Sequence, residues 1–513
     1  MLLHELYREA LASHPDKIAV VCGPDRCSFR ELEESSVSYA RALLSIGVGR
    51  SELVGIFSRN SLDVVRLYLA CFRIGAIAVP ISCLIRAPEV AYEVAHSGLR
   101  VLLASAELAS EVRGLRETVP TLERFLVMNG PVGTPEEDWQ AVVRGATASL
   151  PPVVVEESDP ALILYTSGST DRPKGVTHTH ASMTQLAINR CSTFHHTADH
   201  IFLATGQVCH AAALGVALFP MWLAGGISVF MPDWNVEEWL TMMHCLQPTH
   251  AAFFPSQLAE LLARPETRTA GYNLLEYCAV GGDVAARELQ ERFREITGHE
   301  LSLTLGMTEC GGYITTSPFD RSKSGSLGKP IHGFQVRLLG PDGCDVPPDA
   351  PGEIAVKSGS VMSGYWNDPE ATDRAFANGW MLTGDIARRD GDGYYYFVGR
   401  IKEMIIRDAG NIGPGEVENA ICEHPAVRRC GVIGLPDLRH GQAVHAFVEL
   451  KKDCCPLPTV QELTLFASRM LAERKVPEFW TVIDELPRTA AGKIDRKALR
   501  LLADKSGGTT GTP

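Results

Sequence analysis

Short apolar runs that are typical of buried strands alternate with turns and helical segments along most of the chain. Examples of these runs are LVGIF (53–57), IAVPI (77–81) and LEYCAV (275–280). In the segment that follows the third run, Leu289, Phe293 and Ile296 are spaced to share one face of a helix. The repetition of strand, turn and helix predicts an α/β fold, in which mixed sheets are layered with helices.

The pattern changes near Arg400, where a glycine-rich segment gives way to a compact set of elements. We expect helices at 413–424 and 460–475, and strands at 428–435 and 443–450. A chain of 513 residues also exceeds what a single small domain needs. The sequence therefore predicts a large N-terminal domain and a small α+β C-terminal domain, with a disordered tail at 505–513.

Charge and cysteine usage narrow the classes of function. The formal net charge is −13, and no long basic cluster appears, which disfavours binding of nucleic acid or of an anionic membrane surface. The 14 cysteines lack the CxxC spacing of metal and redox sites. Because MLLHELYREA at the start does not look like a secretory signal, we expect reduced thiols and a cytoplasmic protein.

One uncharged stretch, residues 211–231, is long enough to cross a membrane. It contains Pro220 and the pair Gly225 and Gly226, which interrupt regular structure. The favoured interpretation is a short apolar helix, a stop and a strand in the protein core, with a membrane span as the weaker alternative. We expect no stable membrane insertion.

The segment YTSGSTDRPKG at 165–175 follows the buried-looking run ALILY. It combines glycines, a lysine at Lys174 and four hydroxyl side chains, those of Thr166, Ser167, Ser169 and Thr170. Free backbone N–H groups, rotatable hydroxyls and a mobile cation suit phosphate oxygens. The segment is not a mononucleotide P-loop, because that motif places its lysine directly after a glycine. On its own, a solvated turn is an equal alternative.

Four further motifs decide between these alternatives. They are LTLGMTE (303–309), GWMLTGD (379–385), GRIKEMI (399–405) and LPRTAAGKIDR (486–496). In this order and spacing, together with YTSGSTDRPKG, the chain resembles the adenylate-forming superfamily of acyl-CoA synthetases, peptide-synthetase adenylation domains and luciferases. The resemblance covers nearly the whole chain. It implies an N-terminal AMP-binding domain at 1–399, a hinge at 400–403 and a mobile C-terminal lid domain at 404–504.

The resemblance also implies roles for single residues. The set expected to bind cofactors and co-substrates is Thr166, Ser167, Gly168, Ser169, Thr170, Lys174, Gly282, Asp283, Leu305, Gly306, Asp385, Arg400, Lys402 and Gly410. The phosphate loop and Lys174 would hold the β- and γ-phosphates of ATP, and Thr308 would bind the α-phosphate. Glu309 and Thr170 would help to bind Mg²⁺, which prefers oxygen ligands. Asp385 would accept hydrogen bonds from the ribose hydroxyls, and Arg400 would donate to the nucleotide.

Lys493, by resemblance, bridges the substrate carboxylate and the α-phosphate while the acyl-adenylate forms. The small domain then rotates about a hinge at Lys402, so that a thiol such as that of CoA can displace AMP. The loop that contains Gly410 would line the thiol tunnel. ATP, Mg²⁺ and CoA are therefore the expected cofactors and co-substrates.

The acid pocket, again by resemblance, lies among 206–215, 279–283 and 304–312, with His210 as its gate. The segment around His210, 206–215, has no Asp to pair with an α-amino group, and the pocket segments have no Arg or Lys to meet a second carboxylate. We therefore predict an uncharged monocarboxylic acid, fatty, alicyclic or aromatic. A core histidine without a role is the plain alternative for His210.

Three residues depart from the family pattern: Asp171 in the phosphate loop, Leu305 where an aromatic ring usually stacks on adenine, and Ala409 in the thiol-side loop. None of the three replaces a charged residue that is expected to take part in the reaction. The main prediction is an acid–CoA ligase that acts on a carboxylic acid and CoA, with a homodimer as one alternative for its oligomeric state. Two further alternatives are an adenylating enzyme that loads a separate carrier protein and a nucleotide-binding protein without turnover.

Overall fold

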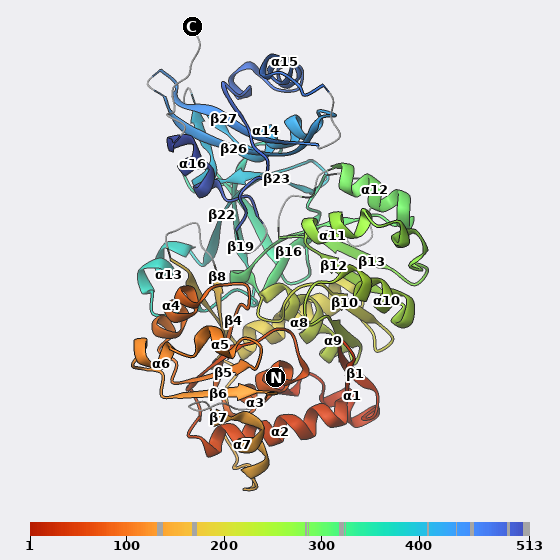
Figure 1. Cartoon of the computed structure of the whole chain (residues 1–513), viewed down its shortest axis with the longest axis vertical. Helices are drawn as coiled ribbons and strands as arrows, with labels where there is room; N and C mark the ends of the chain where they lie inside the picture. The colour runs from red at the N-terminus through yellow and green to blue at the C-terminus, as the bar shows by residue number, and fades with distance from the viewer. Residues whose placement is uncertain are drawn as a thin grey trace. The chain divides into compact units, whose positions relative to one another are not determined.

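The computed structural model describes residues 1–505 apart from 131–136, 167–171, 283–284, 286, 318–322, 324, 408–409, 438, 452–455 and 490–492 (Figure 1). Contacts divide the chain into two compact units. Unit 1 comprises Met1–Ala285, Leu289–Val336 and Val356–Met381. Unit 2 comprises Ala286–Glu288, Arg337–Ala355 and Leu382–Pro513. The mixed α/β architecture with a small C-terminal portion confirms the predicted fold class.

The first sheet of unit 1 has eight strands in the order β20-β9-β8-β4-β3-β5-β6-β7. Their bounds are β20 Gly364–Tyr365, β9 Lys174–Thr179, β8 Pro160–Thr166, β4 Ile77–Ile81, β3 Leu53–Phe57, β5 Val101–Ser105, β6 Arg124–Met128 and β7 Glu137–Asp138. The pairs from β8 through β4, β3 and β5 to β7 are parallel, whereas β8–β9 and β9–β20 are antiparallel. The sheet is therefore mixed, as predicted.

The second sheet of unit 1 has seven strands in the order β14-β13-β12-β10-β11-β1-β2. The bounds are β14 Ser302–Leu303, β13 Tyr277–Val280, β12 His250–Phe253, β10 Ile201–Ala204, β11 Ile227–Phe230, β1 Ile18–Cys22 and β2 Asp25–Ser28. Only the edge pair β1–β2 is antiparallel among these pairs. The carboxyl ends of β10, β12 and β13 therefore meet at one edge, where ligands usually bind in α/β sheets.

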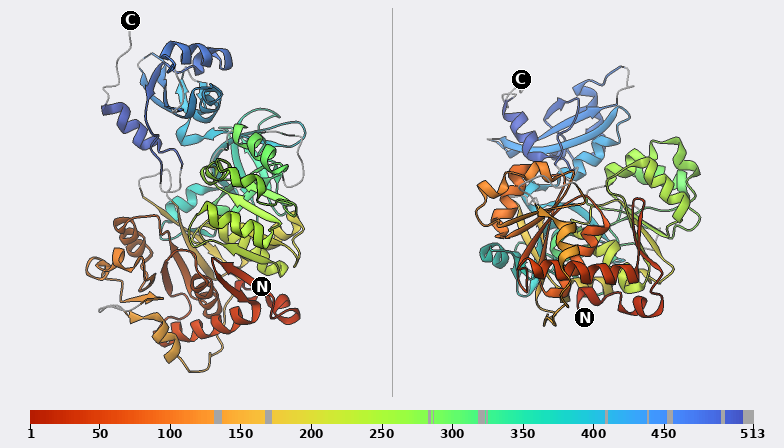
Figure 2. Two further views of the ribbon diagram at one scale, coloured as in Figure 1. Left: turned by 45° about the vertical axis from the view of Figure 1, so that its right-hand side comes forward. Right: turned by 60° about the horizontal axis from the view of Figure 1, so that its bottom comes forward.

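Helices cover these sheets with apolar faces. The main helices of unit 1 are α2 (Phe29–Ser45), α3 (Leu62–Ile74), α4 (Ala87–Ser97), α8 (His180–Phe194), α10 (Val236–Leu246), α11 (Pro255–Leu262) and α12 (Arg287–Thr297). Figure 1 shows α10 and α11 beside β10, β12 and β13, and Figure 2 shows α2, in red, at an outer edge of unit 1. Phe293 is buried against the second sheet, with Leu289 and Ile296 packed beside it. The predicted helix face is confirmed.

The uncharged stretch 211–231 forms a π-helical turn η2 (Ala213–Leu218), the helix α9 (Phe219–Ala224) and the strand β11. Gly225 ends α9 in the left-handed conformation, at φ 71°. Contrary to the expectation, Pro220 does not end the helix. It lies in the first turn of α9, where a proline is tolerated, directly after the π-helical turn η2. Within the described residues, no helix combines the length and apolarity that crossing a membrane requires.

Unit 2 contains most of a five-stranded sheet formed by β18 (Gln335–Leu339), β19 (Gly352–Lys357), β21 (Phe376–Ala377), β22 (Trp380–Arg389) and β23 (Tyr395–Arg400). A second sheet joins β26 (Val427–Asp437), β27 (Gly441–Leu450) and β28 (Phe479–Val482). Helices α14 (Pro414–Cys422), α15 (Val460–Met470) and α16 (Arg496–Lys505) accompany it, together with the hairpin β24 (Ile405–Arg407) and β25 (Gly410–Ile412). The four elements predicted after Arg400 are present.

Helix α15 ends at Met470, earlier than the predicted Lys475. Leu471 has an extended backbone, at φ −120° and ψ 149°, and a separate 3-10 turn, η6 (Glu473–Lys475), follows. The apolar spacing continues through this region, so the sequence pattern does not mark the break. The contact boundary falls within β22, ahead of the expected hinge at 400–403; that hinge and the domain limits remain predictions. Helix α16 includes Lys505, and residues 506–513 of the predicted tail lie outside the described residues.

Candidate active site

The phosphate loop connects two antiparallel strands of the first sheet. Thr166 is the last residue of β8, Lys174 is the first of β9, and the two are register partners. The described residues do not include the rest of the loop, which consists of Ser167, Gly168, Ser169, Thr170 and Asp171, the residue that departs from the family pattern. The hydroxyl of Tyr92 on α4 donates to the carbonyl oxygen of Pro173 at 3.1 Å, and Arg172 lies over the Tyr92 ring. The described end of the loop is therefore anchored to a helix.

Lys174 belongs to a three-residue arrangement that links separate motifs. Its ammonium lies 4.7 Å from the centroid of the Tyr365 ring, a cation–π distance. The Tyr365 hydroxyl donates to Oε1 of Glu309 at 2.8 Å. Burial, together with the carboxylate of Glu309, raises the pKa of Tyr365, so the phenol keeps its proton. The predicted phosphate ligand Lys174 and the predicted Mg²⁺ ligand Glu309 thus share one aromatic partner.

The backbone around Thr308 and Glu309 is held from β9 and from the segment before β20. Nε2 of His178 lies 2.8 Å from the carbonyl oxygen of Thr308, which can only accept, so Nε2 carries the proton. Burial lowers the pKa of His178 to about 4, so the ring is neutral at pH 7. The backbone N–H of Met362 donates to the carbonyl oxygen of Glu309 at 2.8 Å.

Close backbone approaches bring the predicted nucleotide-binding segments together. A Cβ at Gly281 would collide with the Thr304 hydroxyl, and one at Gly306 would lie 2.6 Å from the carbonyl oxygen of Gly312. Gly282 has a left-handed backbone at φ 84°. Leu305, in β15 (Leu305–Met307), is only 8% exposed. The end of β13 and the LGMTE segment therefore lie side by side, whereas Asp283 lies outside the described residues.

His210 follows the end of β10, and its backbone N–H donates to the carbonyl oxygen of Gln207 at 3.0 Å. Burial lowers the pKa of its imidazole, and the nearby carboxyl of Glu93 opposes this shift. Glu93 lies on α4, is only 5% exposed, and its Oε2 has no hydrogen-bond partner. Burial, followed by repulsion from Glu89, raises the pKa of Glu93 to about 8. A protonated carboxylic acid at neutral pH therefore lies close to the predicted pocket gate.

Replacing Glu93 by Gln should change how stability depends on pH. The folded chain holds a proton on Glu93 between pH 4.5 and about 8, whereas the unfolded chain has lost it. Over this window, rising pH lowers the wild-type free energy of unfolding relative to that of Glu93→Gln by up to ~1.4 kcal/mol per pH unit. Above about pH 8 the difference becomes constant. Urea unfolding at a series of pH values measures it.

The exposed Glu117 on α6 (Leu115–Thr118) offers a matched control for that experiment. The variant Glu117→Gln should keep the wild-type pH profile. A Glu93→Gln variant whose stability difference from wild type is the same at every pH would contradict the buried, protonated state of Glu93.

The remaining predicted residues belong to unit 2. Asp385 on β22 and Arg400 on β23 are register partners, and Nε of Arg400 lies 3.1 Å from Oδ1 of Asp385. The Asp385 carboxylate is buried, whereas the Arg400 side chain is 44% exposed. Lys402 is exposed in the 3-10 turn η5 (Ile401–Glu403), and Gly410 begins β25. Asp385 is thus the buried acceptor of this pair. Ala409, which departs from the family pattern, lies outside the described residues.

Lys493 lies in the loop before α16. Its carbonyl oxygen accepts a hydrogen bond from the backbone N–H of Thr489 at 2.8 Å, and Arg488 and Ile494 form an isolated antiparallel bridge. These contacts join the two described ends of the segment, whose residues 490–492 lie outside the described residues. The roles predicted for the residues of unit 2 remain predictions.

Three residues around the site were missed by sequence reasoning: Tyr365, His178 and Glu93. Tyr365 stands in the sequence GYWNDPE, and His178 lies within an apolar–polar strand. Their importance comes from contacts with Glu309 and Thr308, far away in the chain. The sequence could have indicated His178, because a histidine inside a strand is unusual enough to be noted. Nothing in the local sequence distinguishes Glu93 from an exposed helix residue.

Comparison with known proteins agrees with this geometry. The model of the AMP-binding enzyme family matches residues 7–366, and that of the AMP-binding enzyme C-terminal domain matches residues 416–493. The chain therefore belongs to the AMP-binding enzyme family, within the adenylate-forming superfamily that the motifs indicated. The family assignment rests on most of the chain rather than on one motif.

Individual relatives are CoA ligases. The chain is 33% identical to a feruloyl-CoA synthase from Amycolatopsis over 493 residues, which are 95% of this chain and 96% of that protein. It is 32% identical to a 2-succinylbenzoate–CoA ligase from Geobacillus kaustophilus, with 96% of each covered. A crystal structure of an anthranilate CoA ligase in complex with anthranoyl-AMP matches with a TM-score of 0.92 at 26% identity, covering 99% of this chain and 98% of that one.

Proposed function

We propose that the protein is an ATP-dependent acid–CoA ligase. It converts a carboxylic acid and ATP into an acyl-adenylate and pyrophosphate, and then transfers the acyl group to the thiol of CoA with release of AMP. The observation that carries this proposal is the contact of Lys174 with Tyr365 and of Tyr365 with Glu309, which joins the phosphate loop to the motif LTLGMTE (303–309). Family membership and CoA-ligase relatives support the same reaction.

In the first half-reaction, Lys174 and the loop hydroxyls hold the β- and γ-phosphates, and Thr308 holds the α-phosphate. The carboxylate of Glu309 fits Mg²⁺, because this ion prefers oxygen ligands and the hydrogen bond from Tyr365 orients the carboxylate. When bound, Mg²⁺ neutralises charge on the triphosphate. His178 fixes the backbone at Thr308, so the threonine is positioned before ATP arrives.

Asp385 accepts hydrogen bonds from the ribose hydroxyls, and Lys493 offsets the negative charge that develops as the carboxylate attacks phosphorus. The segment around Lys402 serves as the hinge that removes Lys493 before the thiol enters. The loop at Gly410 then lines the thiol path. These assignments rest on the family motifs and on the buried position of Asp385 beside Arg400.

The substrate that we favour is an aromatic monocarboxylic acid. Feruloyl-CoA synthase, 2-succinylbenzoate–CoA ligase, indoleacetate–CoA ligase and anthranilate CoA ligase are all named for acids that contain an aromatic ring. Fatty acids are the second choice, because a medium/long-chain-fatty-acid–CoA ligase from Mycobacterium tuberculosis is 30% identical over 508 residues. We further propose that the reaction takes place in the cytosol, since every cysteine in the described part of the chain is a free thiol.

Pyrophosphate release with a panel of acids tests the proposal. Benzoates, arylacetates and hydroxycinnamates should support release at higher kcat/KM than linear fatty acids of similar size. Added CoA should then give the acyl-CoA thioester, detected by mass spectrometry. A thioester formed on a pantetheinylated carrier protein but not on CoA would favour the carrier-loading alternative. ATP binding without pyrophosphate release from any acid would favour the alternative without turnover.

A further inference from the structure

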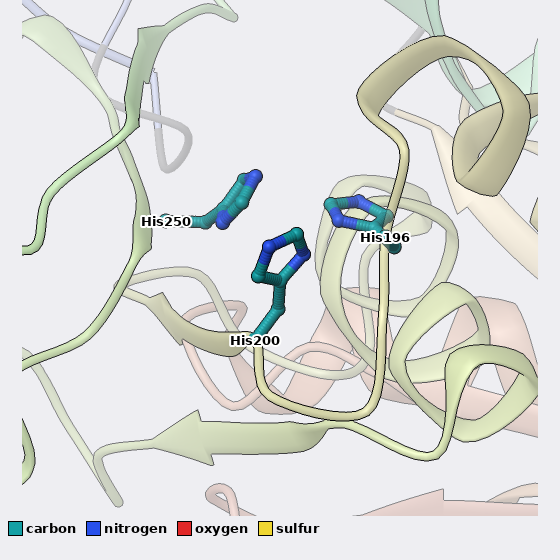
Figure 3. Close-up of side chains that lie close together, drawn as sticks. All are labelled: His196, His200 and His250. Carbon is teal, nitrogen blue, oxygen red and sulfur yellow. The ribbon is translucent and has the colours of Figure 1, made fainter.

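Three histidines converge in unit 1, outside the site described above. Among the residues that the structure describes, His196, His200 and His250 form a group in which one ligand nitrogen from each lies within 4.8 Å of the others (Figure 3). Their ring centroids are 4.8 Å apart for His196–His250 and His200–His250, and 5.7 Å apart for His196–His200. The three rings come from two separate parts of the chain and face one common space.

The fold places this group at the amino ends of parallel strands. His196 follows the end of α8, His200 directly precedes β10, and His250 is the first residue of β12. The residues predicted to bind the nucleotide and the acid follow the carboxyl ends of β10 and β13, at the opposite edge of the sheet. An ion bound by the three histidines would therefore lie away from the reacting groups.

The histidines carry unused metal-binding capacity. Both ring nitrogens of His196 are shielded from solvent and have no hydrogen-bond partner. Nδ1 of His250 lies 2.9 Å from Oγ1 of Thr249, which leaves Nε2 as the nitrogen that can bind a metal. Buried polar atoms without a partner cost folding free energy, and a bound ion would offset that cost at His196.

Charged groups of both signs lie near the histidines, whose neutral imidazole form is the one that binds metal ions. The buried guanidinium of Arg190 opposes a cation here. Glu276 supplies the opposite charge, because its Oε2 lies 3.6 Å from Nε2 of His200.

We propose that His196, His200 and His250 bind a divalent transition-metal ion of the Zn²⁺ class, which has a structural role. Imidazole nitrogens suit Zn²⁺, Co²⁺ and Ni²⁺, whereas Mg²⁺ and Ca²⁺ prefer oxygen. A tetrahedral ion brings the ligand nitrogens to about 3.4 Å from one another. Side-chain rotation of His196 and His200 closes the difference. The Thr197 N–H donates to Nδ1 of His200 at 3.2 Å, which leaves Nε2 of His200 for the ion.

Cobalt binding tests the site. The full chain, with any affinity tag removed, is stripped with a chelator, dialysed and titrated with Co²⁺ while visible absorption is followed. We expect one Co²⁺ per chain with the intense bands of tetrahedral coordination, and displacement of these bands by one equivalent of Zn²⁺. Absent bands, or bands from weak binding in excess Co²⁺ alone, would overturn the proposal.

Variants locate the ion. His196→Gln and His200→Gln should each weaken Co²⁺ binding by about 10–100-fold or more. The matched control His244→Gln removes an exposed histidine of α10 and should keep the wild-type affinity. Because His200 is partly exposed, its variant should fold, and circular dichroism checks this. Equal Co²⁺ binding by all four proteins would mean an adventitious ion only.

Thermal unfolding gives an independent readout. Zn²⁺ should raise the Tm of the wild type and of His244→Gln, because an ion that binds only the folded state stabilises it. The Tm of His200→Gln should not respond. Adenylation should proceed in the chelator-treated wild type, since the site lies at the opposite edge of the sheet from the predicted nucleotide residues. A Tm rise of equal size in wild type and His200→Gln would contradict the assignment.

Discussion

Replacing Lys493 by Ala is expected to lower the rate of acyl-adenylate formation by about 10²–10³-fold, the usual effect of removing one group that stabilises developing charge. The loss should appear in kcat as well as in kcat/KM, because the charge on the pentavalent phosphorus exists only in the transition state. Single-turnover pyrophosphate release with saturating ATP and acid measures this rate. The backbone of Lys493 and Ile494 is held by contacts with Thr489 and Arg488, which alanine at position 493 should leave unchanged.

The second half-reaction separates this role from a general effect on the protein. With synthetic acyl-adenylate supplied, Lys493→Ala should form the CoA thioester at close to the wild-type rate, because Lys493 is proposed to leave before the thiol enters. The control Lys451→Ala removes an exposed lysine directly after β27 and should leave both rates unchanged. Equal loss of both half-reactions in Lys493→Ala would contradict the proposed division between them.

The second large effect is expected at Asp385, the buried carboxylate proposed to bind the ribose. A hydrogen bond to a charged group contributes ~1.5–3 kcal/mol, so Asp385→Asn should lower kcat/KM for ATP by about 10–10²-fold. The ribose hydroxyls do not change during the reaction, so the loss should appear mainly as a higher KM for ATP. Initial rates of pyrophosphate release at varied ATP measure both constants.

A second aspartate–arginine pair in unit 2 offers a matched control. Asp345 pairs with Nε of Arg337 at 2.8 Å, close to the 3.1 Å between Asp385 and Arg400, but its side chain is 62% exposed. Asp345→Asn should therefore keep the wild-type KM for ATP. If both variants raise this KM equally, the effect belongs to the loss of an ion pair in unit 2 and not to a ribose contact.

Much of the architecture could be predicted because local patterns encode it. The strands β3 and β4 have the bounds expected from LVGIF and IAVPI, and the spacing of Leu289, Phe293 and Ile296 gave the buried face of α12. The structure differs from the predicted pattern at two points. Pro220 lies in the first turn of α9, directly after a π-helical turn, and α15 ends at Met470, where the extended residue Leu471 follows.

The site could be predicted only through its motifs. The order of the five motifs indicated Lys174, Glu309 and Asp385, and the structure pairs Asp385 with Arg400 and brings Lys174 close to Glu309 through Tyr365. The contribution of Tyr365 depends on strand β20 pairing with β9, a long-range contact that leaves no local pattern. The three-histidine group likewise needs β10 and β12 to be neighbours, which the sequence spacing does not reveal.

Exchange of labelled pyrophosphate into ATP, in the absence of CoA, tests most directly whether the site at Lys174 makes an acyl-adenylate. The wild-type protein with Mg²⁺ and an aromatic acid should catalyse exchange that depends on the acid, and mass spectrometry should detect the enzyme-bound acyl-adenylate. Absence of both exchange and adenylate with every acid tested, in a folded protein that binds ATP, would contradict the account.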